Sequence, residues 1–341
     1  MTTVVAAPTS GQPNPPETAR KVRSAAAGAD RVFQLTLRGA GLTVLVIMTT
    51  IGLFLFYRGS QALGDAGIWK FITTQAWQPS SHNFGIATVI TGTLLIAAVA
   101  VTFAVPLATG VALYISEYAP RKLRQALINL VDLMAAVPSV VYGLWGFYFL
   151  QEKIIPLAKW ISTTFGWFPF LGISGVDPND PLADKTVYES STFIAGIVVA
   201  LMIMPIISSV MRESFSQSPV GEREGAFALG ATRWGMIRSV VLPFGRGGMI
   251  GGTMLGLGRA MGETIAVYML ISPVFQIQPH ILRSGANSVS ALIALKFGAA
   301  SPFELSALFA AGLALFMLTL VVNFGASAVI ARTRSGALSD A

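Results

Sequence analysis

Two charged residues lie inside an apolar stretch near residue 260, and their types and spacing suit the binding of an anion. Arg259 falls at the midpoint of residues 247–271, and Glu263 follows it by four positions. An arginine at the centre of a membrane-spanning helix costs about 2.5–3.5 kcal/mol even on lenient insertion scales, so a compensating interaction is required. Because Glu263 is four residues on, it is expected to share the helical face of Arg259 and to accept hydrogen bonds from its guanidinium.

This pair of charges has two interpretations. In the first, the two side chains neutralise each other and serve only helix packing. In the second, the planar, bidentate donors of Arg259 fit an oxyanion, and Glu263 holds those donors when no substrate is present. A hydrophobic pair of similar volume would be at least as stable there, so the retained charges favour the second interpretation, a pathway for an anion.

Another apolar stretch holds a single charge, Asp132, about seven residues after its start and thus roughly 10 Å deep at ~1.5 Å per residue. This carboxylate either pairs with a buried donor in a structural role or faces the pathway. Pro138 and Ser139 interrupt the same stretch, which predicts a broken span lining a cavity. Tyr142 and Trp145 follow one turn later, where core packing explains them equally well. The candidate pathway residues are therefore Arg259, Glu263, Asp132 and Ser139.

The composition shows what must hold these residues in place. Of 341 residues, 53% are hydrophobic and 11% are charged, whereas an average soluble domain carries about 25% charged residues. A mean hydropathy of +0.66 leaves too few polar side chains for a water-facing exterior. Without cysteine and with two histidines, disulfides and thiolate metal sites are excluded. The net charge of +7 is scattered between apolar blocks, which argues against nucleic-acid binding.

Six apolar stretches are long enough to cross roughly 30 Å of hydrocarbon. They predict an all-α integral membrane protein with a membrane domain at residues 37–335. A Pro-rich segment, residues 1–36, precedes this domain and is predicted to be a disordered cytoplasmic tail. The expected spans are residues 38–58, 86–116, 125–150, 190–212, 247–272 and 304–331.

The basic residues are unevenly distributed between the two sides of the membrane. With the N-terminus inside, 15 of the 23 Lys and Arg residues lie on the cytoplasmic side, 7 lie on the opposite side, and Arg259 lies within a span. Because Lys and Arg accumulate in cytoplasmic loops, this asymmetry predicts that both termini are cytoplasmic.

Two segments on the outer side are long enough to have structure of their own. The outer loop, residues 151–189, combines aromatic residues with proline and aspartate, which predicts a short interfacial helix followed by a polar loop. It is either a membrane-surface anchor or a docking surface for an extracytoplasmic partner. A re-entrant or interfacial helix is expected at residues 288–297, and the sequence leaves both possibilities open.

The cytoplasmic loop at residues 213–246 holds the most specific pattern in the chain. It reads EGAFALGATRWGMIRSVVLP from Glu224 to Pro243. Glu224 lies near the start of a helical turn, where a carboxylate interacts favourably with the positive helix end, and Gly230 ends or bends that helix. The pattern predicts a short helix–turn–helix across the cytoplasmic membrane face, able to transmit a rigid-body displacement.

This loop resembles the EAA motif of ATP-binding-cassette (ABC) importer permeases, which reads Glu-Ala-Ala, three residues, Gly, nine residues, Ile-x-Leu-Pro. Gly225 stands for the first Ala of the motif, which loosens the first turn by ~1 kcal/mol, and Val240 stands for the Ile. The resemblance implies that the short helix inserts into a groove of an ATPase subunit. The matching residues are Glu224, Ala226, Gly230, Leu242 and Pro243.

Two further segments resemble the phosphate branch of these permeases. They are GLGRAMGETIAV at residues 256–267 and DLMAAVPSVVYGLWG at residues 132–146. The sequence of the first segment is similar to the PstC type of these permeases rather than to the PstA type. Asp132 departs from the family, which usually has Glu there. The resemblance implies the six-span fold of a type I ABC importer permease in a bacterial plasma (inner) membrane, working by alternating access as one half of a phosphate pathway.

The resemblance also implies the partners. They are a homologous permease of the PstA type, a cytoplasmic ATPase dimer and an extracytoplasmic phosphate-binding protein, besides membrane lipid. Glycines at positions 248, 252 and 256, and again at 258 and 262, form faces of small residues that are expected chiefly to permit close helix packing and, as a consequence, to let the fifth span approach that second permease. The chain has no Gly-x-x-x-x-Gly-Lys-Ser/Thr run, so we expect no cofactor on it, with ATP and magnesium held by the ATPase, and no enzymatic activity of its own.

Three other functions remain open at this point. An ion-coupled secondary transporter would also keep charges in the membrane, but it should show inverted repeats and needs no ATPase docking loop. A permease for another oxyanion, such as molybdate or sulfate, would use the same machinery. A regulatory scaffold that signals phosphate status could coexist with transport.

Overall fold

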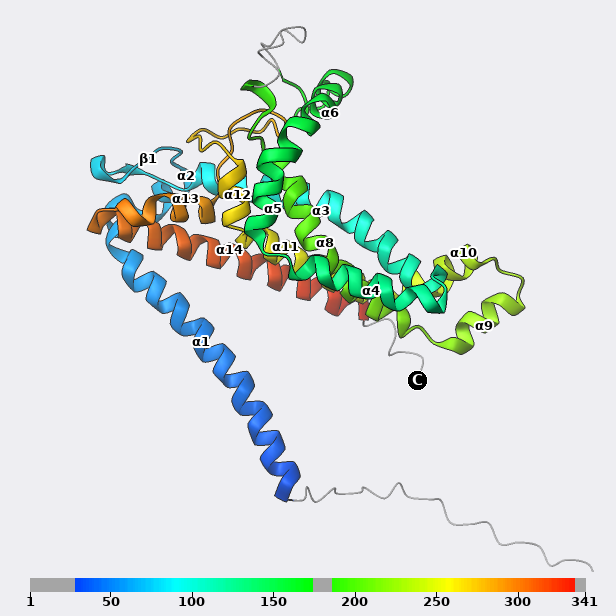
Figure 1. Cartoon of the computed structure of the whole chain (residues 1–341). Coiled ribbons are helices and arrows are strands. Elements are labelled where there is room, and N and C mark those ends of the chain that lie inside the picture. Colours follow the sequence, from blue (N-terminus) through cyan, green and yellow to red (C-terminus); the bar gives the residue numbers. More distant parts are fainter. Residues whose placement is uncertain (1–27, 174–185, 335–341) are drawn as a thin grey trace, which may run out of the picture. The chain divides into compact units, whose positions relative to one another are not determined.

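The computed structural model describes residues 28–173 and 186–334, and most of them are helical (Figure 1). The chain divides into two units, residues 1–51 and 52–341, which we describe separately. Helix α1, Gly28–Ala66, begins in the first unit, where its large apolar side chains are exposed. Residues 28–36 are therefore helical and not part of a disordered tail, because the apolar run extends back to Val32; the rest of the expected tail lies outside the described residues.

Three long helices form the core of the second unit. They are close enough to pack because α3 presents a row of buried alanines, and α8 and α11 present glycines at the contacts. A Cβ on Gly196 of α8 would overlap Val99 of α3, and one on Gly256 of α11 would overlap Ile207 of α8. The core helices are α3 at Ala87–Leu113, continued by a π-helical turn at Tyr114–Tyr118 (η2), α8 at Thr192–Ser216 and α11 at Leu242–Gly262.

The glycines at positions 248, 252 and 256 of α11 make the close helix packing expected of them, but they make it within this chain. Gly248, Gly252 and Gly256 face α8 of the same chain, where Cβ atoms would meet Ser214, Val210 and Ile207, respectively. This stripe of small residues therefore serves packing within the chain and is not free for a partner helix.

The third predicted span is broken, as expected, at Pro138. Helix α4, Arg121–Ala136, and the helix that starts at Ser139 meet at an angle of 87°. Pro138 lacks an N–H and disfavours helical geometry at Val137, which is extended. The second arm runs to Thr164, so the first part of the expected outer loop continues this helix. Its parts are α5 at Ser139–Trp145, a π-helical turn at Gly146–Leu150 (η3) and α6 at Gln151–Thr164.

The fifth predicted span differs from the expected continuous helix over 247–272. It starts upstream, runs without interruption to Gly262, breaks at Glu263 and Thr264, and resumes as a short helix. Glu263 is extended, with φ −66° and ψ 126°. The elements are α10 at Arg233–Met236, a π-helical turn at Ile237–Val241 (η4), α11, and α12 at Ile265–Leu270.

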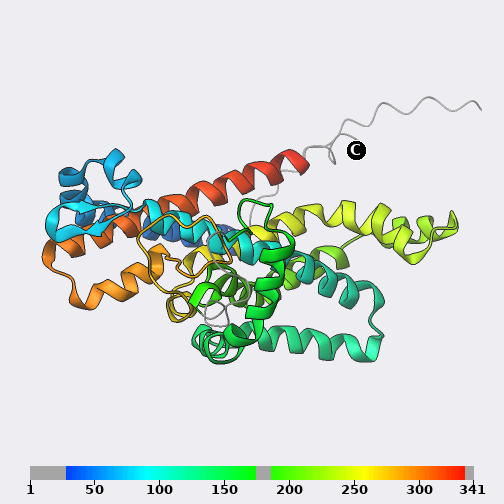
Figure 2. The ribbon, with the colours of Figure 1, turned by 90° about the horizontal axis from the view of Figure 1, so that it is seen from above.

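The predicted coupling loop, residues 213–246, is itself mostly helical. It contains the end of α8, the short helix α9 at Val220–Ala228, and the α10–η4 start of the next long helix. Figure 2 shows α9 and α10 extending beyond the other helices of the second unit.

Short elements and the long helix α14 surround a second apolar cluster that includes Phe71, Trp77 and Phe84. A short helix does form where the sequence predicts one, near residues 288–297. The elements are α2 at Ile68–Thr73, an antiparallel pair of β1 at Trp77–Gln78 and β2 at Asn83–Phe84 joined by a 3₁₀ turn at Pro79–Ser81 (η1), α13 at Val289–Lys296 with a 3₁₀ turn at Phe297–Ala299 (η5), and α14 at Pro302–Arg334.

Within the described ranges, five helices are long and apolar enough to cross a membrane, or six if the bent pair around Pro138 is one span. The sequence-predicted spans match these helices, apart from the breaks described above and from longer ends at α1 and α8. The all-α membrane architecture is thus confirmed.

Candidate functional site

The segment that carries the EAA-like pattern folds as a helix–turn–helix. Helix α9 ends at Ala228, and Gly230, two residues later, has a φ of 83° in the left-handed region. The N–H of Gly230 donates to the carbonyl of Phe227 at 2.9 Å, and the N–H of Ala231 donates to that of Ala226 at 3.0 Å. This pair of bonds satisfies the last carbonyls of the helix and needs glycine at the left-handed position. Thr232 then caps α10 by accepting a hydrogen bond from the N–H of Gly235.

The outer surface of α9 is open. Glu224 is exposed, and nothing lies within 4 Å of a Cβ placed on Gly225. Leu229 is 90% exposed, and Val220 and Phe227 are exposed as well. Ala226, by contrast, packs against the core. Exposed apolar side chains on a short projecting helix are typical of an interaction surface.

The other end of the pattern lies on a different element. Leu242 is partly buried and Pro243 is exposed, and both lie at the start of α11, directly after the π-helical turn η4. Proline cannot donate the helical hydrogen bond to the carbonyl four residues earlier, and the wider turn accommodates that loss. The pattern therefore joins an exposed helix to the start of a long core helix.

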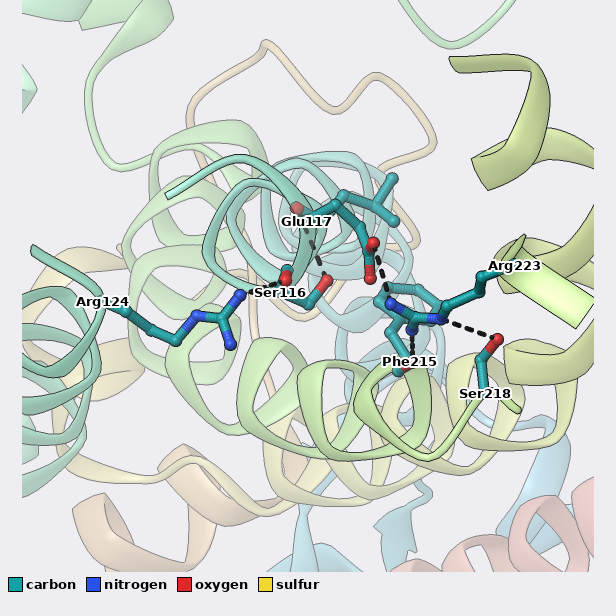
Figure 3. A network of polar contacts seen from close by, with 7 residues as sticks. Ser116, Glu117, Arg124, Phe215, Ser218 and Arg223 are labelled. Carbon is teal, nitrogen blue, oxygen red and sulfur yellow. Dashed lines mark hydrogen bonds and ion pairs between the residues drawn. The ribbon is translucent and has the colours of Figure 1, made fainter. Parts of the chain in front are cut away.

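One contact of α9 was not predicted from the sequence. Arg223 donates to the carboxylate of Glu117 on the last turn of α3, with 3.1 Å between Nη1 and Oε2 (Figure 3). The Glu117 side chain is 4% exposed. A carboxylate near a helix C-terminus is electrostatically unfavourable, so an acid in the last turn of an otherwise uncharged helix was a signal that a cation lies nearby.

Arg259 lies in the last turn of α11, where the negative end of the helix dipole favours a cation. Its side chain is exposed and lines a cavity of about 440 Å³. In the part of the chain that the structure describes, Arg259 forms no hydrogen bond or ion pair. The cavity is lined by Arg259, Thr319, Asn323, Ile206, Met254, Leu255 and Gly258, from α8, α11 and α14.

Glu263 does not share the helical face of Arg259, which corrects the expected ion pair. The helix ends at Gly262, and the backbone of Glu263 is extended. The Glu263 carboxylate therefore does not occupy the position that a continuous helix would give it, on the same face as Arg259. Ser290 of α13 holds this break, because its hydroxyl donates to the carbonyl of Glu263 at 2.6 Å. No ion pair within 4.0 Å joins Arg259 to any carboxylate among the described side chains.

The two helix breaks lie next to each other. Helices α5 and α12 pack in parallel, because Gly143 approaches Ala266 and Gly146 approaches Leu270 (Figure 1). This register places Ser139, the first residue of α5, beside the break that contains Glu263. The structure thus brings together two of the four pathway candidates that lie on different spans.

Asp132 is not brought to the same place by any contact. It is exposed on α4, before the bend, and forms no hydrogen bond or ion pair within residues 28–173 and 186–334. Tyr142 and Trp145 line a separate, mainly apolar cavity of about 290 Å³ at the bend, together with Leu201 of α8.

Comparison with known proteins identifies the family. Residues 104–335 match the family described as "Binding-protein-dependent transport system inner membrane component". The chain belongs to this family. Its EAA-like segment, both broken helices and the Arg259 cavity all lie within the matched residues.

Several members of this transport family are similar along most of the chain. "Phosphate transport system permease protein PstC 2" of Mycobacterium tuberculosis is 38% identical over 304 residues, covering 88% of this chain and 91% of the relative. "Phosphate transport system permease protein PstC" of Xylella fastidiosa (strain 9a5c) is 37% identical and covers 87% and 89%, respectively. The protein is therefore a transport-system component of the inner membrane.

The fold is similar to that of an ABC importer subunit. A chain from the crystal structure of a bacterial ABC transporter involved in the import of the acidic polysaccharide alginate superimposes with a TM-score of 0.50. It is 17% identical, and the match covers 89% of this chain and 99% of that chain. This likeness agrees with the type I importer permease architecture expected from the sequence.

Proposed function

We propose that this protein is the PstC-type permease subunit of an ATP-driven phosphate importer and forms one half of the translocation pathway. The observation that carries the proposal is the Arg259 guanidinium, which lies beside a cavity and has no hydrogen-bond or ion-pair partner among the described residues. A guanidinium presents donors that match a tetrahedral oxyanion, and no carboxylate among the described side chains forms an ion pair with it. The names of the relatives favour phosphate among the possible oxyanions.

The adjacent helix breaks complete this candidate pathway. Discontinuous helices place polar backbone and side chains inside a membrane protein where a substrate passes. Ser139 and Glu263 lie at these breaks, and Asp132 lies on the arm that leads to one of them. Ser139 donates to the passing anion, whereas the two carboxylates shape the field along the pathway.

The segment around α9 is the proposed ATPase coupling site. Glu224, Gly225 and Ala226 form the docking helix, Gly230 ends it, and α11 begins at Leu242–Pro243 and receives its displacement. ATP and magnesium bind to a cytoplasmic ATPase dimer, so the permease itself performs no catalysis.

Three further features complete the proposed assembly. A homologous PstA-type permease supplies the other half of the pathway. A phosphate-binding protein delivers the substrate at the outer face, and both termini of this chain lie in the cytoplasm, as the distribution of basic residues predicts.

The test is phosphate uptake into proteoliposomes that contain both permeases and the ATPase, with the binding protein present. We expect uptake that requires ATP and that excess sulfate or molybdate reduces by less than a factor of two. Uptake of sulfate or molybdate in preference to phosphate would identify a permease for another oxyanion. Uptake driven by a proton gradient without the ATPase would instead identify a secondary transporter, and either result would overturn the proposal.

A further inference from the structure

The last turn of α3 is contacted by arginines from three other elements. This turn, residues 114–118, is π-helical and ends the longest core helix, so its carbonyl groups and the helix dipole present negative charge. One arginine comes from α4, one from α9 and one from α10. The contacts are Arg124 to the carbonyl of Ser116 at 2.5 Å, Arg223 to the carboxylate of Glu117 at 3.1 Å, and Arg233 over the ring of Tyr118 at 5.3 Å from its centroid (Figure 3 shows the first two).

Arg223 and Glu117 form the most buried of these contacts. Their side chains are 20% and 4% exposed, respectively, so solvent screens their attraction little. Arg223 also donates to the carbonyl of Phe215 at 2.6 Å and to the hydroxyl of Ser218 at 3.2 Å. The guanidinium is thus held between the ends of α3 and α8 with its direction fixed.

The second carboxylate oxygen of Glu117 shows that compensation of the buried charge depends on Arg223. Oε1 is buried and has no hydrogen-bond partner among the described atoms, so Arg223 is the cation that compensates the buried charge. If Arg223 moved away, Glu117 would remain buried without a partner, which is strongly unfavourable. The two residues must therefore move together.

This ion pair is also the main route from α9 to α3. Helix α9 packs chiefly against α10 and η4, which belong to its own segment. Arg223 extends from α9 to the end of α3, and Arg233 adds a weaker cation–π contact from α10. Arg124 then joins the same turn of α3 to the start of α4, the arm that precedes the bend at Pro138.

We propose that Glu117 is a positioning residue that couples the docking helix α9, through Arg223, to displacement of α3 and α4. This inference rests on the proposed function of α9 as an ATPase docking helix. It assigns the transmission step to a buried ion pair, in addition to the continuous helix from α10 to α11. When the ATPases move α9, the pair carries that movement to the end of α3 and, through Arg124, toward the broken span.

The first test compares transport with ATP hydrolysis in the reconstituted complex. The variants are Glu117→Gln, Arg223→Gln and the double variant, with Arg121→Gln as a matched control because Arg121 is an exposed arginine at the start of α4. We expect each single variant to retain the bound ATPase and to move at least about tenfold less phosphate per ATP. The double variant should be no worse than the poorer single variant, because both remove the same link.

Two results of this test would overturn the proposal. One is a transport-to-hydrolysis ratio within about twofold of the control in both single variants. The other is loss of the bound ATPase from Glu117→Gln, which would make the pair a requirement for docking or folding instead of transmission. Arg223→Lys, which keeps the charge but not the three directed donors, should fall between wild type and Arg223→Gln.

A second measurement does not depend on which substrate is transported. The chain has no cysteine, so a Leu133→Cys reporter on α4, at a position that is 65% exposed, is the only thiol in this subunit. We expect ATP with vanadate to change its maleimide labelling rate in the complex, and Glu117→Gln to reduce that change at least threefold while Arg121→Gln preserves it. An unaltered change in Glu117→Gln would contradict the inference. This result stands even if phosphate proves not to be the substrate.

Discussion

The hydroxyl of Tyr142 donates a hydrogen bond to the carbonyl of Met134, 3.0 Å away, across the bend between α4 and α5. Pro138 has no N–H to donate to this carbonyl, which otherwise accepts a hydrogen bond from the N–H of Val137 at 3.4 Å, and the tyrosine hydroxyl gives it a second, shorter one. A side chain from the second arm thus fixes the first arm at its angle of 87°.

Loss of this hydroxyl should weaken the bend. Tyr142→Phe removes this hydrogen bond between the two arms, so we expect a loss of about 1 kcal/mol of stability. Thermal unfolding of the purified complex in detergent measures the effect. Tyr148→Phe is the matched control, because Tyr148 is 75% exposed. Equal melting temperatures for the two variants would show that the bond does not hold the bend.

A close approach between the backbones of Gly92 and Asn287 gives a second prediction. A Cβ on Gly92 of α3 would overlap the backbone carbonyl of Asn287, which cannot move aside as a flexible side chain could. Gly92→Ala should therefore destabilise the protein by about 1–3 kcal/mol or more through overpacking. Gly110→Ala, in the same helix but with open space around it, should be neutral or slightly stabilising. The melting temperatures should differ by several degrees, and coinciding values would contradict the packing described.

Substitution by alanine should have opposite effects on local stability at two glycines of the EAA-like segment. Gly230 has a φ of 83°, where alanine is strained by about 1–2 kcal/mol, so Gly230→Ala should disturb the turn after α9. Gly225 is helical and surrounded by open space, so Gly225→Ala should strengthen α9 by about 0.5–1 kcal/mol. The amount of ATPase that copurifies should fall for Gly230→Ala alone. A loss with Gly225→Ala and not with Gly230→Ala would be the opposite of this expectation.

A substitution at the exposed end of α9 can test docking of the ATPase without affecting folding. Leu229 is 90% exposed, so Leu229→Ala should leave the melting temperature of the isolated subunit unchanged while it reduces ATPase copurification several-fold. Leu130→Ala, at an exposed position of α4 outside this segment, should alter neither quantity. Undiminished copurification of Leu229→Ala would place the docking surface elsewhere.

Much of the fold could be predicted from the sequence, because a membrane span depends on local composition. Apolar length alone located the long helices, and Pro138 located one break. The left-handed turn at Gly230 was also predictable, because a glycine after a short helix is itself the signal. These features need no knowledge of what packs where.

The errors arise where structure depends on contacts that are distant in the sequence. The break at Glu263 has no proline to announce it, and it is held by Ser290 from another helix. The assumption of a continuous helix therefore produced an Arg259–Glu263 ion pair that the structure lacks. The sequence likewise predicts close packing at the glycines of α11 without showing that α8 is the helix that covers Gly248, Gly252 and Gly256.

The Glu117–Arg223 pair was missed for the same reason. The two residues are 106 positions apart. Glu117, as an acid at a helix end, indicates that a cation lies nearby, but the sequence does not show which of the basic residues supplies it. Their burial, which gives the pair its importance, is visible only once α3, α8 and α9 are placed together.

The central claim is that the Arg259 guanidinium is unpaired because it binds the transported anion. The most direct test is ATP-dependent phosphate uptake by the reconstituted complex with Arg259→Gln, measured together with ATP hydrolysis. Arg246→Gln is the matched control, because Arg246 is an exposed arginine on the same helix. A charge-assisted contact of about 1.5–3 kcal/mol predicts that Arg259→Gln loses uptake at least about tenfold while the complex assembles and basal hydrolysis persists. Uptake by Arg259→Gln equal to that of Arg246→Gln would contradict the account.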